Sequence, residues 1–194
     1  MLFRATLEKM LPSLKESGYV GYIDINCIVN GRGIYPLEFT SRFGYPTISI
    51  QLEGITLAAG EWLYRLARGD SFEIKTKRGF QVGVRLLVPT YFSHDDNSKM
   101  VQMYRDLAII FKNRFNLEGI HIEDIRNDNG VWRVAGSSGC LLVVTGSGTT
   151  VDEARHVVYG RIQNIMVPNM FYRTDIGTNW ATDSDKLHAW GYLR

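Results

Sequence analysis

The sequence predicts an α+β fold. Residues 19–43 read as two strands joined by a tight turn, and residues 139–165 read as a buried strand, a glycine turn and a helix. Residues 2–14 and 100–115 carry apolar side chains near helical spacing. Helical and strand periodicities therefore occur in one chain, and the strand pair is joined by a short turn, as in antiparallel sheets.

The composition is that of a water-soluble globular protein. The chain has 194 residues, of which 45% are hydrophobic and 22% charged, and its formal net charge is only +2. This charge gives no reason to expect a nucleic-acid partner. No run approaches the roughly 20 apolar residues of a membrane span, and charges near the N-terminus argue against a signal peptide. Cys27 and Cys140 lie in apolar runs, which suits buried thiols in a reducing compartment. We expect a cytoplasmic protein.

The N-terminal third contains two helical segments and one hairpin. Pro12 lies inside the first helical pattern, so we expect a kink or a helix boundary near it and an end at Gly18. Residues 48–69 read as one well-buried helix that contains Trp62 and ends near Gly69.

The remaining segments alternate between strand and helix patterns. Strand-like alternation covers residues 71–92, a loop follows at 93–99, and 100–115 predicts an amphipathic helix. A hairpin is expected to turn at 127–130. The helix expected over 151–165 begins with a capping box, Thr150 followed by Glu153.

The register of the first hairpin decides which side chains share a face. A three-residue loop at 31–33 would place Asn26 opposite Glu38 and Asp24 opposite Thr40. All four polar side chains would then lie on one side of the sheet. The other side would be apolar and packed.

This polar face is the strongest candidate for a site. A hard cation such as Mg2+ prefers oxygen ligands and often takes one or two carboxylates, with water and phosphates completing its shell. Asn26, Glu38 and Thr40 offer such oxygens, and Arg42 is placed to bind a phosphate or carboxylate. The alternative is an ordinary solvated face with weak cross-strand pairs.

Three other features carry weaker signals. The glycine-rich turn at 145–150 precedes a helix and could bind an anion, or could simply be a tight capped turn. Arg173 and Asp175 could bind a ligand or pair with each other on the surface. The four histidines show no metal-ligand spacing.

Three motifs in order resemble the C-terminal half of phosphoribosylamine–glycine ligase (glycinamide ribonucleotide synthetase), an ATP-grasp family. They are "GYIDINCIVNGRGIYPLEFTSRFGYPT", "CLLVVTGSGTTVDEARHVVYGRI" and "FYRTDIG". The first is similar to the family's Glu-Phe-Asn-x-Arg-Phe-Gly-Asp-Pro-Glu, and the third to its Arg-x-Asp-Ile-Gly. The resemblance runs from about residue 2 to residue 180.

The resemblance implies a reaction and roles for particular residues. The family activates glycine with ATP as an acyl phosphate, which the amine of phosphoribosylamine attacks in purine biosynthesis. Glu38 looks like a ligand of Mg2+ (or Mn2+) that bridges to ATP, with Thr40 in the place of the family's asparagine ligand. Arg42 resembles a phosphate- or substrate-binding arginine. Arg173, with Asp175 in the same signature, resembles a residue that meets the ribose phosphate.

The sequence departs from the family in ways that bear on activity. Thr40 is a poorer metal ligand than asparagine, and Tyr45 and Thr47 replace an aspartate and a glutamate. The family's N-terminal lobe and most of its nucleotide pocket are missing. We therefore expect activity only with a separate N-terminal half as partner. A non-catalytic module for a nucleotide or anionic metabolite, or an inactive remnant, are the alternatives.

The resemblance also implies a division of the chain. Residues 1–75 would form the C-terminal part of an ATP-grasp lobe, an antiparallel sheet with helices. Residues 76–194 would form the family's small C-terminal domain, a mixed sheet or partial barrel.

Overall fold

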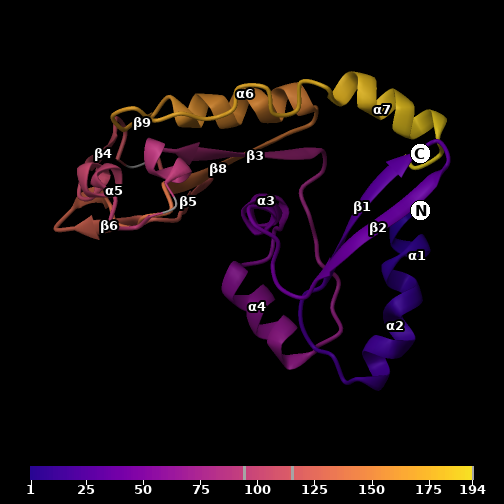
Figure 1. Cartoon of the computed structure of the whole chain (residues 1–194). Coiled ribbons are helices and arrows are strands. Elements are labelled where there is room, and N and C mark those ends of the chain that lie inside the picture. The colour runs from indigo at the N-terminus through magenta and orange to yellow at the C-terminus, as the bar shows by residue number, and fades with distance from the viewer. Residues whose placement is uncertain (94, 115, 194) are drawn as a thin grey trace. The chain divides into compact units, whose positions relative to one another are not determined.

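The computed structural model describes residues 1–93, 95–114 and 116–193, and it confirms the α+β class (Figure 1). No helix in this described part is long and apolar enough to cross a membrane. The elements follow in the order α1 (Leu2–Ala5), α2 (Leu7–Glu16), β1 (Asp24–Asn30), β2 (Gly33–Thr40), α3 (Thr47–Gly54), α4 (Ala59–Arg68), β3 (Phe80–Leu87), η1 (Pro89–Phe92), α5 (Lys99–Tyr104), β4 (Ala108–Phe111), β5 (Ile120–Ile122), β6 (Ile125–Asp128), β7 (Val131–Val134), β8 (Cys140–Gly148), α6 (Val151–Ile162), β9 (Ile165–Met166) and α7 (Trp180–Ala189).

The chain divides into two compact units. Unit 1 comprises Met1–Ile48, Ile55–Thr76 and Thr178–Arg194, and unit 2 comprises Ser49–Gly54 and Lys77–Gly177. The assignment of the two predicted parts to an ATP-grasp lobe and to the ligase's C-terminal domain stays a prediction.

Unit 2 is built around β8. This strand pairs antiparallel with β3 on one side and with β5 on the other, and α6 packs against β8 and β3. The side chains of Leu141–Thr145 are fully buried. Such continuous burial explains why the strand reads as an apolar run instead of alternating. The expected strand, turn and helix over 139–165 are confirmed.

A second antiparallel sheet in unit 2 has the order β6-β7-β4-β9. Its β6–β7 hairpin turns at Asn129 and Gly130, both with positive φ, where the sequence predicted a turn. Residues 76–194 thus contain two antiparallel sheets, of three and four strands, in place of the mixed sheet that the resemblance implied.

The amphipathic helix predicted over 100–115 is wrong over most of its length. Helix α5 ends at Tyr104, and Asp106 adopts a left-handed backbone (φ 69°), which interrupts the helical path. The following Ala108–Phe111 segment, with two β-branched isoleucines, forms β4. Phe115, the last residue of the predicted helix, lies outside the described residues, as does His94.

Two N-terminal expectations also need correction. The first helix is interrupted at Thr6, whose hydroxyl donates to the Leu2 carbonyl (2.7 Å), and Pro12 lies inside α2. The single helix expected over 48–69 is two helices, α3 and α4, the second of which ends at the left-handed Gly69 as predicted.

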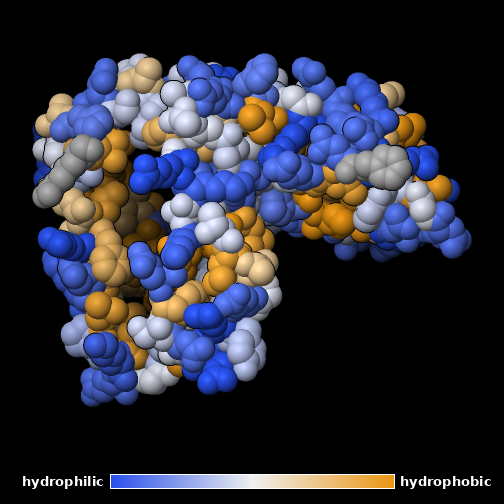
Figure 2. Space-filling view, turned by 180° about the vertical axis from the view of Figure 1, so that it is seen from behind, coloured by the Kyte–Doolittle hydropathy of each residue, from blue (hydrophilic) through white to orange (hydrophobic). Residues whose placement is uncertain are grey.

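Unit 1 has little core of its own. Of the buried hydrophobic side chains in the described residues, only that of Trp62 belongs to unit 1, where it packs against Phe43. Apolar surface is instead visible at the left of Figure 2, on the part of the molecule that unit 1 forms. Its large exposed hydrophobic residues are Met1, Leu2, Phe3, Leu11, Tyr19, Val20, Ile28, Tyr35, Leu37, Phe39, Tyr45, Leu63, Tyr64, Ile74 and Trp190.

Candidate functional site

The hairpin of β1 and β2 has the predicted cross-strand pairs. Asp24 lies opposite Thr40, and Asn26 lies opposite Glu38. The turn is one residue shorter than expected, because Asn30 pairs with Gly33. A bulge in β2 adds one residue opposite the Asn26–Cys27 step. It offsets the shorter turn, so that Asn26 still lies opposite Glu38 as predicted.

The polar face of the hairpin holds one cross-strand hydrogen bond and one buried carboxylate oxygen. Asn26 Nδ2 donates to Glu38 Oε1 (3.1 Å), which holds the carboxylate against β1. Asp24 Oδ1 is buried and has no hydrogen-bond partner among the described residues. A buried oxygen without a partner is costly, so a bound cation or an ordered water would stabilise it.

The opposite face of the hairpin differs from the prediction. It was expected to be packed, but Leu37 is 63% exposed and Phe39 49% exposed. Leu37 occupies the bulge, and both side chains remain exposed. Two large apolar groups in solvent on one strand are a candidate interaction surface.

The donor set is small. Among the described residues, no three His, Cys, Asp or Glu side chains gather to hold a metal. Asp24 and Glu38 supply two carboxylates on one face of the hairpin, and one or two carboxylates is the number that Mg2+ often takes together with phosphates and water.

Arg42 lies just beyond β2 and is exposed. Its Nη1 donates to the Phe43 carbonyl (3.0 Å). The Phe43 ring packs between Tyr22 and Trp62, at centroid distances of 4.9 and 5.4 Å, which anchors the chain after Arg42. The backbone that carries Arg42 is therefore held in place by the packing of Phe43. The guanidinium uses one donor for the Phe43 carbonyl and keeps its other donors available for an anion.

Arg173 and Asp175 lie in unit 2 and bind each other. Arg173 Nε and Nη2 donate to the two Asp175 oxygens at 2.9 and 2.6 Å, a bidentate pair. The hydrogen bonds from Arg173 lower the pKa of Asp175, and those to Asp175 raise the pKa of Arg173. Both side chains are exposed, so the pair is accessible to a ligand.

The turn before α6 is a tight capped turn. Thr150 accepts from the Glu153 amide, and the Glu153 carboxylate accepts from the Thr149 amide, so the predicted capping box is confirmed. A side chain on Gly148 would collide with the Ala154 backbone, since its Cβ would lie 2.4 Å from that nitrogen. The glycines allow close strand–helix packing, and the Glu153 carboxylate takes the backbone amide of Thr149 as its donor in this turn.

The sequence reading missed Glu53. This α3 residue is only 7% exposed, and its carboxylate accepts from Ser147 Oγ (2.7 Å) and Thr145 Oγ1 (2.9 Å). It also pairs with Lys77 and Arg161, each at 3.1 Å. Burial raises the pKa of Glu53, but the hydrogen bonds from Ser147, Thr145 and Lys77 and the charge of Arg161 outweigh it and lower the pKa to about 2. The sequence feature that could have indicated a buried acid is the single carboxylate in the largely apolar segment "ISIQLEG".

His121 extends this buried network. Its Nε2 lies 3.1 Å from Thr145 Oγ1, and burial lowers the pKa of His121. Thr145 is fully buried, so no substrate reaches it. The network links α3, β8, β5 and α6 through hydrogen bonds and ion pairs within unit 2.

Comparison with known proteins gives a consistent result. No protein-family model matches the chain. A curated phosphoribosylamine–glycine ligase from Listeria innocua is 26% identical over 159 residues, or 81% of this chain. One from Mycobacterium bovis is 27% identical over 170 residues, or 86% of this chain. The chain is similar to this ligase. The resemblance expected from the three motifs is confirmed.

Solved structures agree on the fold. The crystal structure of phosphoribosylamine–glycine ligase from Thermotoga maritima aligns with a TM-score of 0.63 and 24% identity, covering 86% of this chain and 40% of that one. The biotin carboxylase subunit of pyruvate carboxylase aligns with a TM-score of 0.53 and 15% identity, over 83% of this chain and 35% of that one. Both support the α+β fold of this chain.

The similarity covers only part of the ligase. The chain spans a little over a third of the curated relatives' length, 36% of the Listeria protein and 37% of the Mycobacterium protein.

Proposed function

We propose that this chain is the C-terminal portion of a phosphoribosylamine–glycine ligase in purine biosynthesis and works with a separate N-terminal part in the cytoplasm. The hairpin is the observation behind this proposal, because its register gathers Asp24, Asn26, Glu38 and Thr40 on one face in a chain that is similar to the ligase over 159 residues.

The polar face fits a divalent cation. The buried, unpartnered Asp24 oxygen and the Glu38 carboxylate would bind Mg2+ or Mn2+, with Thr40 acting directly or through water. When bound, such a cation neutralises charge on ATP phosphates during phosphoryl transfer. Asn26 orients Glu38 through its 3.1 Å hydrogen bond and can turn its own amide oxygen to the metal.

The arginines would hold anionic groups. Arg42 would bind a phosphate or the acyl phosphate beside the metal, where a fixed positive charge stabilises developing negative charge. Arg173 would meet the ribose phosphate of the amine substrate. Its present partner Asp175 would then hold the guanidinium's orientation or exchange with the phosphate.

The remaining machinery would come from the N-terminal part. The chain spans about a third of the ligase, and unit 1 has a single buried hydrophobic side chain among its described residues. A lobe with so little core is expected to be completed by another polypeptide segment. Leu37 and Phe39 are available for such a contact.

Reconstitution tests this function. The chain would be mixed with a separately expressed N-terminal half, ATP, Mg2+, glycine and phosphoribosylamine, and ADP release followed. We expect turnover that needs both halves and falls at least about a hundredfold in Glu38→Ala, since a metal ligand is lost. Glu16→Ala, at an exposed residue of α2, is the control and should keep full activity.

Two results would change the assignment. Turnover that persists in Glu38→Ala would remove the metal site from the hairpin. Absence of turnover with any N-terminal half, from a folded chain, would favour a binding module for a nucleotide or anionic metabolite.

A further inference from the structure

The second sheet of unit 2 opens between β4 and β7. These strands pair at Ala108 with Arg133 and at Ile109 with Trp132, and the ladder then stops. From Ile110 onward β4 pairs with β9 instead. At this opening, where the ladder between β4 and β7 stops, lies a cavity lined by residues of both strands.

The cavity is small and mostly apolar. Its volume is about 180 Å³, and buried Ile109 and Phe111 form part of its wall. The Trp132 ring meets the Phe111 ring edge-on at 6.3 Å. For comparison, a cavity of about 150 Å³ with aliphatic and aromatic walls holds a benzene molecule. This cavity therefore has room for one six-membered ring or a compact branched group.

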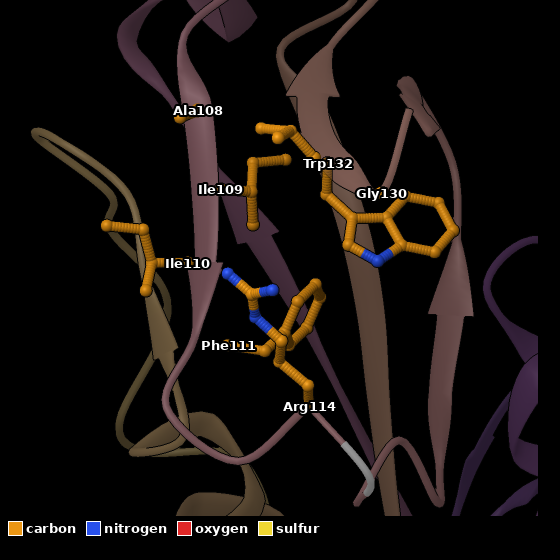
Figure 3. A pocket seen from close by; sticks show the side chains of 8 residues that line it. Ala108, Ile109, Ile110, Phe111, Arg114, Gly130 and Trp132 are labelled. Carbon is orange, nitrogen blue, oxygen red and sulfur yellow. The ribbon is translucent and has the colours of Figure 1, made fainter. Parts of the chain in front are cut away.

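One charge lies at the cavity. Among the described residues, Arg114 is the one charged residue of its lining, and Figure 3 shows the side chain rising from the loop after β4. Arg114 is exposed and makes no hydrogen bond or ion pair with any other described residue. A guanidinium beside apolar walls has its donors available for an incoming anion.

We propose that this opening binds a small organic carboxylate with a compact aromatic or branched apolar group. The apolar group would fill the space beside Ile109, Phe111 and Trp132, and the carboxylate would accept two hydrogen bonds from Arg114. Apolar walls would not solvate a multiply charged phosphate, and one guanidinium would not neutralise it, so a monocarboxylate is the better match. The site is independent of the proposed ligation.

Titration by NMR tests the site. The full chain, labelled with 15N, would be titrated with sodium benzoate at constant ionic strength, and the indole Nε1 signal of Trp132, assigned with Trp132→Phe, followed. We expect a saturable shift with a millimolar dissociation constant. Benzyl alcohol, which lacks the charge, and acetate, which lacks the ring, should each bind about tenfold more weakly or worse.

Variants separate the charge from the fold. Arg114→Met keeps an unbranched apolar stem without the charge, and because the residue is exposed the variant should fold; it should weaken benzoate binding about tenfold. Arg105→Met removes another exposed arginine of unit 2 and should leave binding unchanged. Equal binding of benzyl alcohol, unchanged affinity in Arg114→Met, or no shift of the Trp132 signal would overturn the proposal.

Discussion

At the scale of single residues, Glu53 is a buried charge with several partners. Four groups stabilise its ionised form, and they come from Lys77, from β8 and from α6. Its folded pKa of about 2 lies below the ordinary value of 4.5. Ionised Glu53 therefore stabilises the folded state above about pH 5, and this stabilisation is lost as the pH falls from about 5 toward 2.

Replacing Glu53 by glutamine should remove this pH-dependent stability. A difference of about 2.5 pKa units corresponds to about 3 kcal/mol, so we expect the free energy of unfolding at pH 7 to fall by about that amount. Urea denaturation at pH 7, 5, 4 and 3 would measure it. Glu73→Gln, at an exposed acid, is the matched control and should stay within about 0.5 kcal/mol of the parent. If the free energy of unfolding changed with pH in the same way in Glu53→Gln and in the parent, Glu53 would not be the source of the pH dependence.

The sequence predicted the hairpin residues better than it predicted Glu53. Asn26 and Glu38 meet because alternation and a short turn are local properties. Glu53 is joined to Thr145 and Arg161 from roughly 90 to 110 positions away, and no local pattern reports such a contact. The roles of Glu38, Thr40 and Arg42 in binding stay predictions.

At the scale of elements, α6 follows its local signals closely. Thr150 caps the helix, and Glu153 completes the box from the first turn. Both residues lie next to the helix start in sequence, so the signal and the structure coincide.

The cap gives a second prediction. Thr150→Ala removes the acceptor of the Glu153 amide, and the free energy of unfolding should fall by about 1 kcal/mol. Thr150→Ser keeps a hydroxyl and should lose much less. Urea denaturation at pH 7 compares them, and equal stability of the alanine and serine variants would mean that the cap does not contribute.

The failed element is the 100–115 helix. Met100, Met103 and Leu107 have helical spacing, which predicted a helix from the pattern alone. The left-handed Asp106 and the pairing of β4 with β7 and β9 override this pattern. Residues 108–111 form a strand because they pair with strands that are distant in sequence. The local sequence pattern does not report such pairing.

At the scale of the whole molecule, the two units differ in how much core they contain. Unit 2 holds the buried strands β3 and β8. Unit 1 holds many exposed apolar side chains and one buried one among its described residues. Regions with few buried apolar contacts open more readily.

Hydrogen exchange should reveal this difference. In the chain alone, we expect amides of β8 to exchange slowly and those of β1 and β2 to exchange at least about a hundredfold faster, because their opening costs less free energy. Adding the N-terminal half should slow exchange in β1 and β2 and leave β8 unchanged. Mass spectrometry of exchanged peptides would measure both.

Two exchange results would argue against this account. Equal protection of β1 and β8 in the chain alone would show that unit 1 is stable by itself. Unchanged exchange in β1 and β2 on adding an active N-terminal half would place the contact elsewhere.

The central place of β8 also has a consequence during synthesis. Both of its neighbours, β3 and β5, precede it in the chain, and β3 ends at Leu87, about 60 residues before β8 ends at Gly148. At about 5–20 residues per second, the ribosome needs several seconds to make that interval. During this time β3 lacks β8 as its partner strand, so its unpaired backbone groups and apolar side chains are exposed to other nascent chains and to chaperones.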